Sequence, residues 1–146
     1  MEEISPNWIA LIVAAISALV VGFVWYNPKV FGTIWMREAG ITEEKAKKAN
    51  MPKVFSWSVI LAFMASFFIW SLVMYGGGAG EIHGTPKYMT FKHGAFHGAI
   101  AALFLVMPAM VTNALFEQKS FKYMAINVGY WIVTFSLMGG IVNAWN

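Results

Sequence analysis

Residues 8–26 read WIALIVAAISALVVGFVWY, a run of 19 residues without a single Asp, Glu, Lys or Arg. An α-helix rises 1.5 Å per residue, so about 20 apolar residues cross the hydrocarbon core of a bilayer. Three further runs of this kind follow, at residues 54–75, 94–116 and 123–145. Each of the four runs is long enough to span a membrane as a helix.

These runs predict the fold class, an all-α membrane bundle of four transmembrane helices. The chain has 146 residues, so little is left for a separate aqueous core, and we expect a single membrane domain over residues 1–146. The predicted helices cover about 8–27, 54–75, 93–117 and 122–145.

The composition supports a membrane protein and excludes several kinds of chemistry. Hydrophobic residues make up 59% of the chain and charged residues 12%, against about 45–50% and about 25% in soluble proteins. The chain has no cysteine, so disulfides and thiolate metal sites are excluded, and the sequence implies no cofactor. The cations flank the apolar runs, so we interpret them as topology signals; we expect the lipid bilayer, and not nucleic acid, as the partner.

The distribution of cations predicts the orientation in the membrane. Lys and Arg resist translocation, so the more basic loops are expected on the cytoplasmic side. Eight cations lie between the first and second runs or between the third and fourth: Lys29, Arg37, Lys45, Lys47, Lys48, Lys53, Lys119 and Lys122. The opposite side has only Lys87 and Lys92. We therefore predict a plasma (inner) membrane protein with both termini outside and the first loop cytoplasmic.

The first loop is predicted to contain a short interfacial helix. Residues 29–40 mix apolar side chains with two cations, which is typical of a helix lying among lipid headgroups, with Trp35 as its anchor. Thr42 then reads as the N-cap of a second short helix, because Glu43 and Glu44 follow it in the favourable first turn.

Small residues predict how the helices pack. A bilayer gives no hydrophobic drive for helix association, so close backbone approach must replace it. The first helix has small residues at four-residue spacing, and the third has a similar stripe: Ala10, Ala14, Ala18 and Gly22; Gly94, Gly98, Ala102 and Ala109.

The fourth helix has small or polar residues on both sides, which suggests protein contacts on both sides and motivates a homo-oligomer or a partner membrane subunit. Pro108 is expected to kink the third helix.

Polar residues near the inner ends of the third and fourth helices suggest an intramembrane pocket. Asn113 and Glu117 are one turn apart, and Asn127 lies across the turn between the helices, with Tyr130 on the same side as Asn127. Intramembrane polar groups are costly and often functional. The alternative is that the two asparagines only join the helices by hydrogen bonds.

Histidines near the outer end of the third helix suggest a second site. His93 and His97 have the i, i+4 spacing that can place two imidazoles on one metal ion, and His83 and Glu81 lie in the preceding loop. Zinc or copper would suit such ligands. The alternative is that His93 faces water and His97 bonds a neighbouring helix.

Several short motifs spread along the chain resemble the uncharacterised family called domain of unknown function 1761. They are Trp25-Tyr26-Asn27-Pro28, Phe31-Gly32, Trp35-Met36, Asn113-Ala114-Leu115-Phe116-Glu117, Gly129-Tyr130 and Met138-Gly139. The resemblance implies a small four-helix integral membrane protein without an assigned activity or catalytic residues.

Two classes of function follow from these observations. The first is a non-enzymatic membrane component, either a passage for a small solute or an accessory subunit. The second is a metal-binding or enzymatic membrane protein that uses the outer histidines or the inner Asn/Glu pocket. The sequence favours the first class because it shows no convincing catalytic set.

Overall fold

The computed structural model describes residues 5–75 and 87–145, and within these ranges the chain is helical with no strand. Four segments are long and apolar enough to cross a membrane, which confirms the predicted fold class. The elements in chain order are α1 (Trp8–Trp25), η1 (Pro28–Gly32), α2 (Thr33–Ala39), α3 (Glu43–Lys47), α4 (Met51–Tyr75), α5 (Phe91–Ala101), η2 (Ala102–Val106), α6 (Met107–Phe116) and α7 (Phe121–Ala144).

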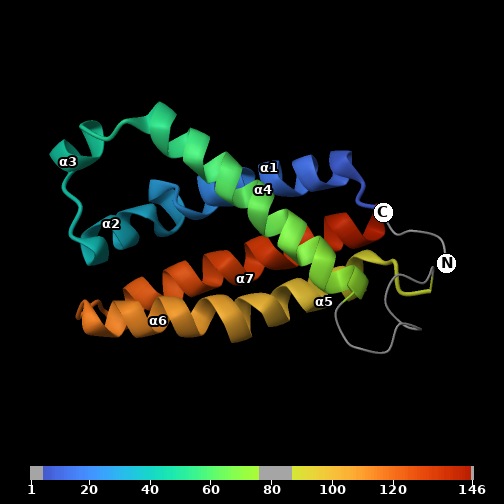
Figure 1. Ribbon diagram of the computed structural model, residues 1–146. Coiled ribbons are helices and arrows are strands. Elements are labelled where there is room, and N and C mark those ends of the chain that lie inside the picture. The colour runs from blue at the N-terminus through green and yellow to red at the C-terminus, as the bar shows by residue number, and fades with distance from the viewer. Residues whose placement is uncertain (1–4, 76–86, 146) are drawn as a thin grey trace.

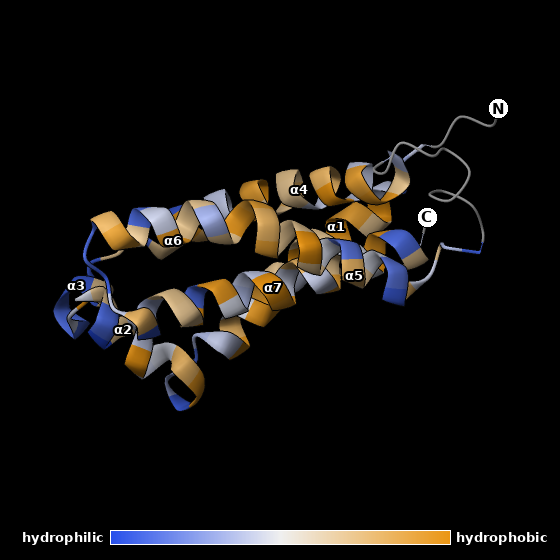
Figure 2. Cartoon of the chain, turned by 90° about the horizontal axis from the view of Figure 1, so that it is seen from below, coloured by the Kyte–Doolittle hydropathy of each residue, from blue (hydrophilic) through white to orange (hydrophobic). Residues whose placement is uncertain are grey.

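The spans begin and end within three residues of the predicted bounds. The largest difference is at α4, which begins at Met51 because the Asn50 side chain accepts a hydrogen bond from the Lys53 backbone N–H at 3.1 Å. Thr42 caps α3 as expected, accepting from the Lys45 N–H at 3.2 Å. Figure 2 shows apolar residues along the spans and hydrophilic residues near α3 at one end and the start of α5 at the other.

Helix α7 is the centre of the bundle. It packs against α1, α4 and α5, and in Figure 1 it runs beside α5 and α6 along its whole length. Its buried residues, which include Asn127, Thr134 and Asn143, therefore lie on more than one side. Neighbours within one chain account for the two-sided pattern; a homo-oligomer or partner subunit stays a prediction.

The contact between α5 and α7 depends on glycine. A Cβ added to Gly94 would meet the Gly139 carbonyl, and one added to Gly98 would meet the Phe135 carbonyl. Only hydrogen atoms fit between the two backbones at these positions. The small-residue stripe of the third span is confirmed as a helix contact at Gly94, Gly98 and Ala102, but its last member, Ala109, is exposed. In the stripe of the first span, Ala10, Ala14 and Ala18 are buried.

Pro108 does not break its helix. The third span runs from α5 into a π-helical turn, η2, and on into α6. Proline cannot donate a backbone hydrogen bond, and its ring needs room in the preceding turn; the wider π turn at Ala102–Val106 provides that room.

Helix α4 has two unlike halves. Its C-terminal half is held in the bundle, where Ile69 and Val73 are buried and the Ser66 hydroxyl lies 3.1 Å from the Leu11 carbonyl oxygen. Every residue from 51 to 61 is exposed except Ser58, which is half-buried. Figure 1 shows α4 crossing the bundle and moving away from α7 toward its own N-terminus.

Candidate functional site

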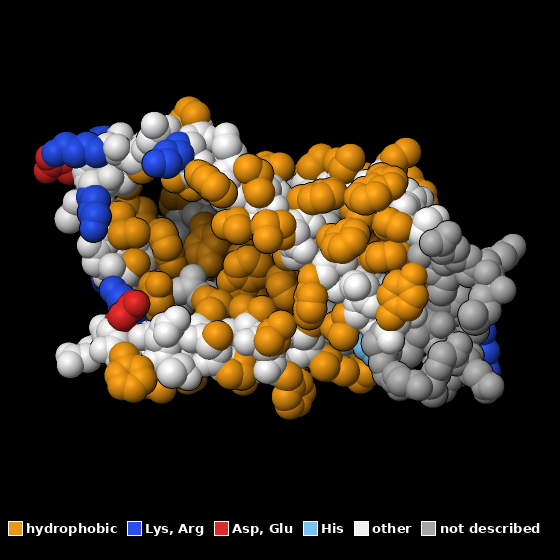
Figure 3. All heavy atoms as spheres, in the orientation of Figure 1, with side chains coloured by type: hydrophobic (Ala, Val, Ile, Leu, Met, Phe, Trp, Pro, Cys, Tyr) orange, Lys and Arg blue, Asp and Glu red, His pale blue; other side chains and the backbone are white. Residues whose placement is uncertain are grey.

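The divergence of α4 leaves an apolar groove beside the bundle. The groove has a volume of about 670 Å³, within the range of about 300–1,000 Å³ typical of ligand pockets. Figure 3 shows it as a hollow with hydrophobic walls on one face of the molecule. It is lined by Ala18, Leu19, Gly22, Phe23, Tyr26, Asn27, Pro28, Trp35, Met51, Val54, Phe55, Ser58, Leu61, Ala62, Tyr130 and Trp131.

One wall of the groove is fixed by hydrogen bonds to Asn127 of α7. The Asn127 Oδ1 accepts from the Tyr26 hydroxyl at 2.8 Å and from the Trp35 Nε1 at 3.1 Å, and its amide nitrogen donates to the Tyr123 carbonyl at 3.0 Å. The rings of Tyr26 and Trp35 meet edge to face, with centroids 5.2 Å apart. One buried amide thus ties the end of α1 and the helix α2 to α7.

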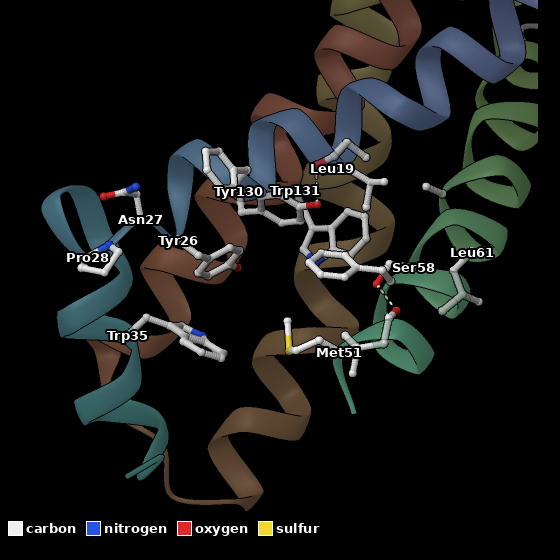
Figure 4. A pocket seen from close by; sticks show the side chains of 16 residues that line it. Leu19, Tyr26, Asn27, Pro28, Trp35, Met51, Ser58, Leu61, Tyr130 and Trp131 are labelled. Carbon is white, nitrogen blue, oxygen red and sulfur yellow. Dashed lines mark hydrogen bonds between the residues drawn. The ribbon is translucent and has the colours of Figure 1, made fainter. Parts of the chain in front are cut away.

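Trp35 is turned toward the bundle, although it was expected to anchor its helix among the lipid headgroups. Its ring lies in the groove beside Tyr26, as Figure 4 shows. A tryptophan N–H finds a strong partner in a buried side-chain oxygen, which explains the inward orientation. The helix α2 itself forms as predicted.

Other polar groups of the groove also bond to the chain itself. The Tyr130 hydroxyl donates to the Ala18 carbonyl at 3.1 Å, and the Ser58 hydroxyl donates to the Val54 carbonyl at 2.8 Å. Together with Tyr26 and Trp35, four polar side chains of the lining are engaged inside the protein. Apart from the Asn27 amide and the Trp131 indole N–H, the groove therefore presents mainly rings, methyl groups and methylenes to an occupant.

Close packing completes the joint between α1 and α7. The Trp25 Nε1 donates to the Ile126 carbonyl at 3.0 Å, and its ring covers Gly129, where an added Cβ would lie 2.9 Å from the indole. The backbone of Tyr26 leaves no room for a Cβ on Gly32. Trp25, Gly32 and Gly129 belong to the motifs that carry the family resemblance. The sequence did not predict that these motifs meet where α1 packs against α7.

Helix α2 forms the edge of this wall and is held against the turn between α6 and α7. The Lys119 ammonium lies 3.5 Å from the Ala39 carbonyl oxygen. A hydrogen bond with the Ser120 hydroxyl, and then the Arg37 guanidinium at 3.0 Å, hold the pKa of the Glu38 carboxyl below its usual range.

The predicted pocket of Asn113, Glu117, Asn127 and Tyr130 is divided by the structure. Tyr130 lines the groove and Asn127 holds its wall by bonds to Tyr26 and Trp35, whereas Asn113 of α6 and Glu117, which follows α6, are exposed. The Asn127 oxygen accepts from a hydroxyl and an indole N–H, so both of its acceptor positions are taken by residues other than Asn113.

The histidine pair is close, but the proposed third ligand is outside the described residues. The rings of His93 and His97 have centroids 4.6 Å apart, and the ring of Tyr88 lies 5.4 Å from that of His93. His83 and Glu81 fall in the segment that the structure does not describe. Within 5–75 and 87–145, no group of three or more possible His, Cys, Asp or Glu ligands comes together.

The fold and the groove define a small four-helix membrane protein with an open apolar site. The chain belongs to the family described as protein of unknown function, DUF1761, whose model matches residues 9–143. This match confirms the resemblance drawn from the motifs. No curated protein and no solved structure matches the chain.

Proposed function

We propose that this protein is a non-enzymatic membrane component that holds the hydrocarbon chain of a membrane lipid in the groove. The observation that carries the proposal is that Tyr26, Trp35, Tyr130 and Ser58 bond to the protein itself. A hydrophilic solute would find few partners there, and burying its polar groups without partners is unfavourable. An apolar chain needs no partners.

The position of the groove also supports a lipid. Its walls belong largely to three of the membrane-spanning helices, α1, α4 and α7. The groove opens sideways, since Phe23 and Leu61 line it while 77% and 57% of their surfaces are exposed. In a bilayer, lipid chains face that opening and can enter without crossing water.

The test is to fill the groove with a ring and count retained lipids. Ser58→Phe places a phenyl group inside the groove, whereas Ser56→Phe places it on the far side of α4, where Ser56 is exposed and outside the lining. The two serines form a matched pair, because each donates to the carbonyl four residues earlier. The measurement is native mass spectrometry of protein released from lipid nanodiscs.

We expect the wild type and Ser56→Phe to retain a tightly bound lipid and Ser58→Phe to lose it. Equal retention in the two variants, or a wild type without bound lipid, would refute the proposal.

A partner helix is a second candidate occupant, favoured by the exposure of residues 51–61 of α4. An apolar helix half without protein neighbours in its own chain can also lie against another subunit, as an accessory protein would. In the same mass spectra, a partner helix in the groove gives a complex that is heavier than one chain and carries no bound lipid. That complex should dissociate in Ser58→Phe.

For the orientation, we propose that α2 and α3 lie on the cytoplasmic side with both termini outside. The support is the excess of cations at that end. The first and last described segments meet at one end of the bundle, where the Asn7 side-chain amide donates to the Trp145 carbonyl at 2.6 Å. Accessibility labelling of a cysteine placed at Ala46, in a chain that has no other cysteine, measures the side directly.

A further inference from the structure

The groove has two ends of different chemistry. Residues Asn27, Trp35 and Met51 line it near the loop end, and Ala18 and Ala62 line it toward the middle of the bundle. The α4 side, from Met51 to Ala62, extends about 16 Å at 1.5 Å per residue. This is roughly half of the about 30 Å hydrocarbon thickness, so the groove covers the depth of one leaflet.

The loop end of the groove is basic. Figure 3 shows Lys and Arg side chains gathered around that end of the hollow. The loop of residues 27–53 and the turn between α6 and α7 carry eight cations against four glutamates.

Two of these cations adjoin the lining itself. Lys29 follows Pro28 and Lys53 precedes Val54, and both lysines are exposed. Within residues 5–75 and 87–145 the ion pairs join Arg37 to Glu38 and Lys48 to Glu44, so neither Lys29 nor Lys53 is neutralised by one.

We infer that the occupant of the groove is a lipid with an anionic head group, whose chain lies along the groove and whose phosphate lies at the basic loop end, where Lys29 and Lys53 adjoin the lining. This inference rests on the proposed function. A chain one leaflet long in the groove brings its head group to the loop end, where the lysines attract negative charge. A zwitterionic lipid fills the same groove but gains less from the two ammonium groups.

The experiment measures head-group selection separately from lipid retention. The full chain is placed in nanodiscs of equal parts phosphatidylcholine and phosphatidylglycerol, and native mass spectrometry identifies the lipid that stays bound. The test variant is Lys29→Gln/Lys53→Gln. The matched control is Lys87→Gln/Lys92→Gln, which removes the same charge at the opposite end of the bundle.

We expect the wild type and the control to retain phosphatidylglycerol in preference to phosphatidylcholine. The test variant should retain as much lipid in total but lose the preference by about five-fold or more, which is the order of one lysine at a membrane surface. Lipid bound without head-group preference, or a preference that both double variants lower equally, overturns the inference and leaves the proposed function standing. No bound lipid, or a dimer without lipid, overturns both.

Discussion

The contact between α5 and α7 and the groove beside α4 differ in how closely two membrane helices approach each other. In a bilayer, two apolar helices gain little from each other unless their backbones approach closely. Helix α5 presents Gly94 and Gly98, which bring it against the α7 backbone. The N-terminal half of α4 presents Val54, Phe55 and Leu61 and stays apart.

The difference shows that glycine allows the closest approach of two helices in this bundle, at the contact between α5 and α7. Within α4, the packed half buries both small and large side chains, among them Ala62, Ser66 and Trp70. In the open half, Val54, Phe55 and Leu61 line the groove, and the Ser56 and Ser58 hydroxyls donate to carbonyls of α4 itself.

The largest expected effect comes from adding one methyl group to the tight contact. Gly98→Ala pushes a Cβ into the Phe135 carbonyl, so the helices must separate, and we expect a loss of about 1–3 kcal/mol in the free energy of unfolding. Gly22→Ala is the matched control, since its Cβ would lie at an ordinary 3.6 Å from the Tyr130 ring. Unfolding in mixed micelles measures both; equal losses would show that close approach does not distinguish the two regions.

A second, smaller effect is expected at the fixed wall of the groove. Asn127→Ala removes the acceptor of the Tyr26 hydroxyl and the Trp35 N–H, at a cost of about 1–2 kcal/mol. Hydrogen exchange over residues 28–39 should accelerate as α2 comes loose. Asn113→Ala, on the exposed side of α6, should change neither quantity; a matching effect there would support the pairing of Asn113 with Asn127 that the sequence suggested.

The smallest effect is expected at Glu38 of α2, at the edge of the groove wall. Because Ser120 and Arg37 hold the Glu38 pKa below its usual value of about 4.3, this carboxylate stabilises the docking of α2 at neutral pH. The contribution is present above the pKa of the unfolded chain, and it is lost as the pH falls through the lowered pKa of the folded protein.

Hydrogen exchange of α2 between pH 3 and 7, corrected for intrinsic rates, should show this loss in the wild type. Glu38→Gln should flatten the profile. An unchanged profile in the variant would show that another group controls the docking of α2.

The candidate site was only partly predictable. Asn127 and Tyr130 were identified because polar residues within a span are conspicuous, and the histidine pair because its i, i+4 spacing suits a metal ion. The partner predicted for Asn127 was wrong. Asn127 accepts hydrogen bonds from Tyr26 and Trp35, which lie about 100 positions earlier in the chain. Helical spacing reports which residues share a face, but not which distant segment covers that face.

The sequence by itself determined the four spans, the short helices of the first loop and the small-residue stripes, because each depends on neighbours a few residues apart. Only the tertiary structure decided that α7 lies at the centre, that Trp35 turns inward and that α4 leaves the bundle at Leu61. These depend on which helices approach closely, and that is the outcome of competition among side chains of different size. Gly94 and Gly98 let α5 close on α7, whereas the half of α4 that carries Phe55 and Leu61 diverges from the bundle and leaves the groove open.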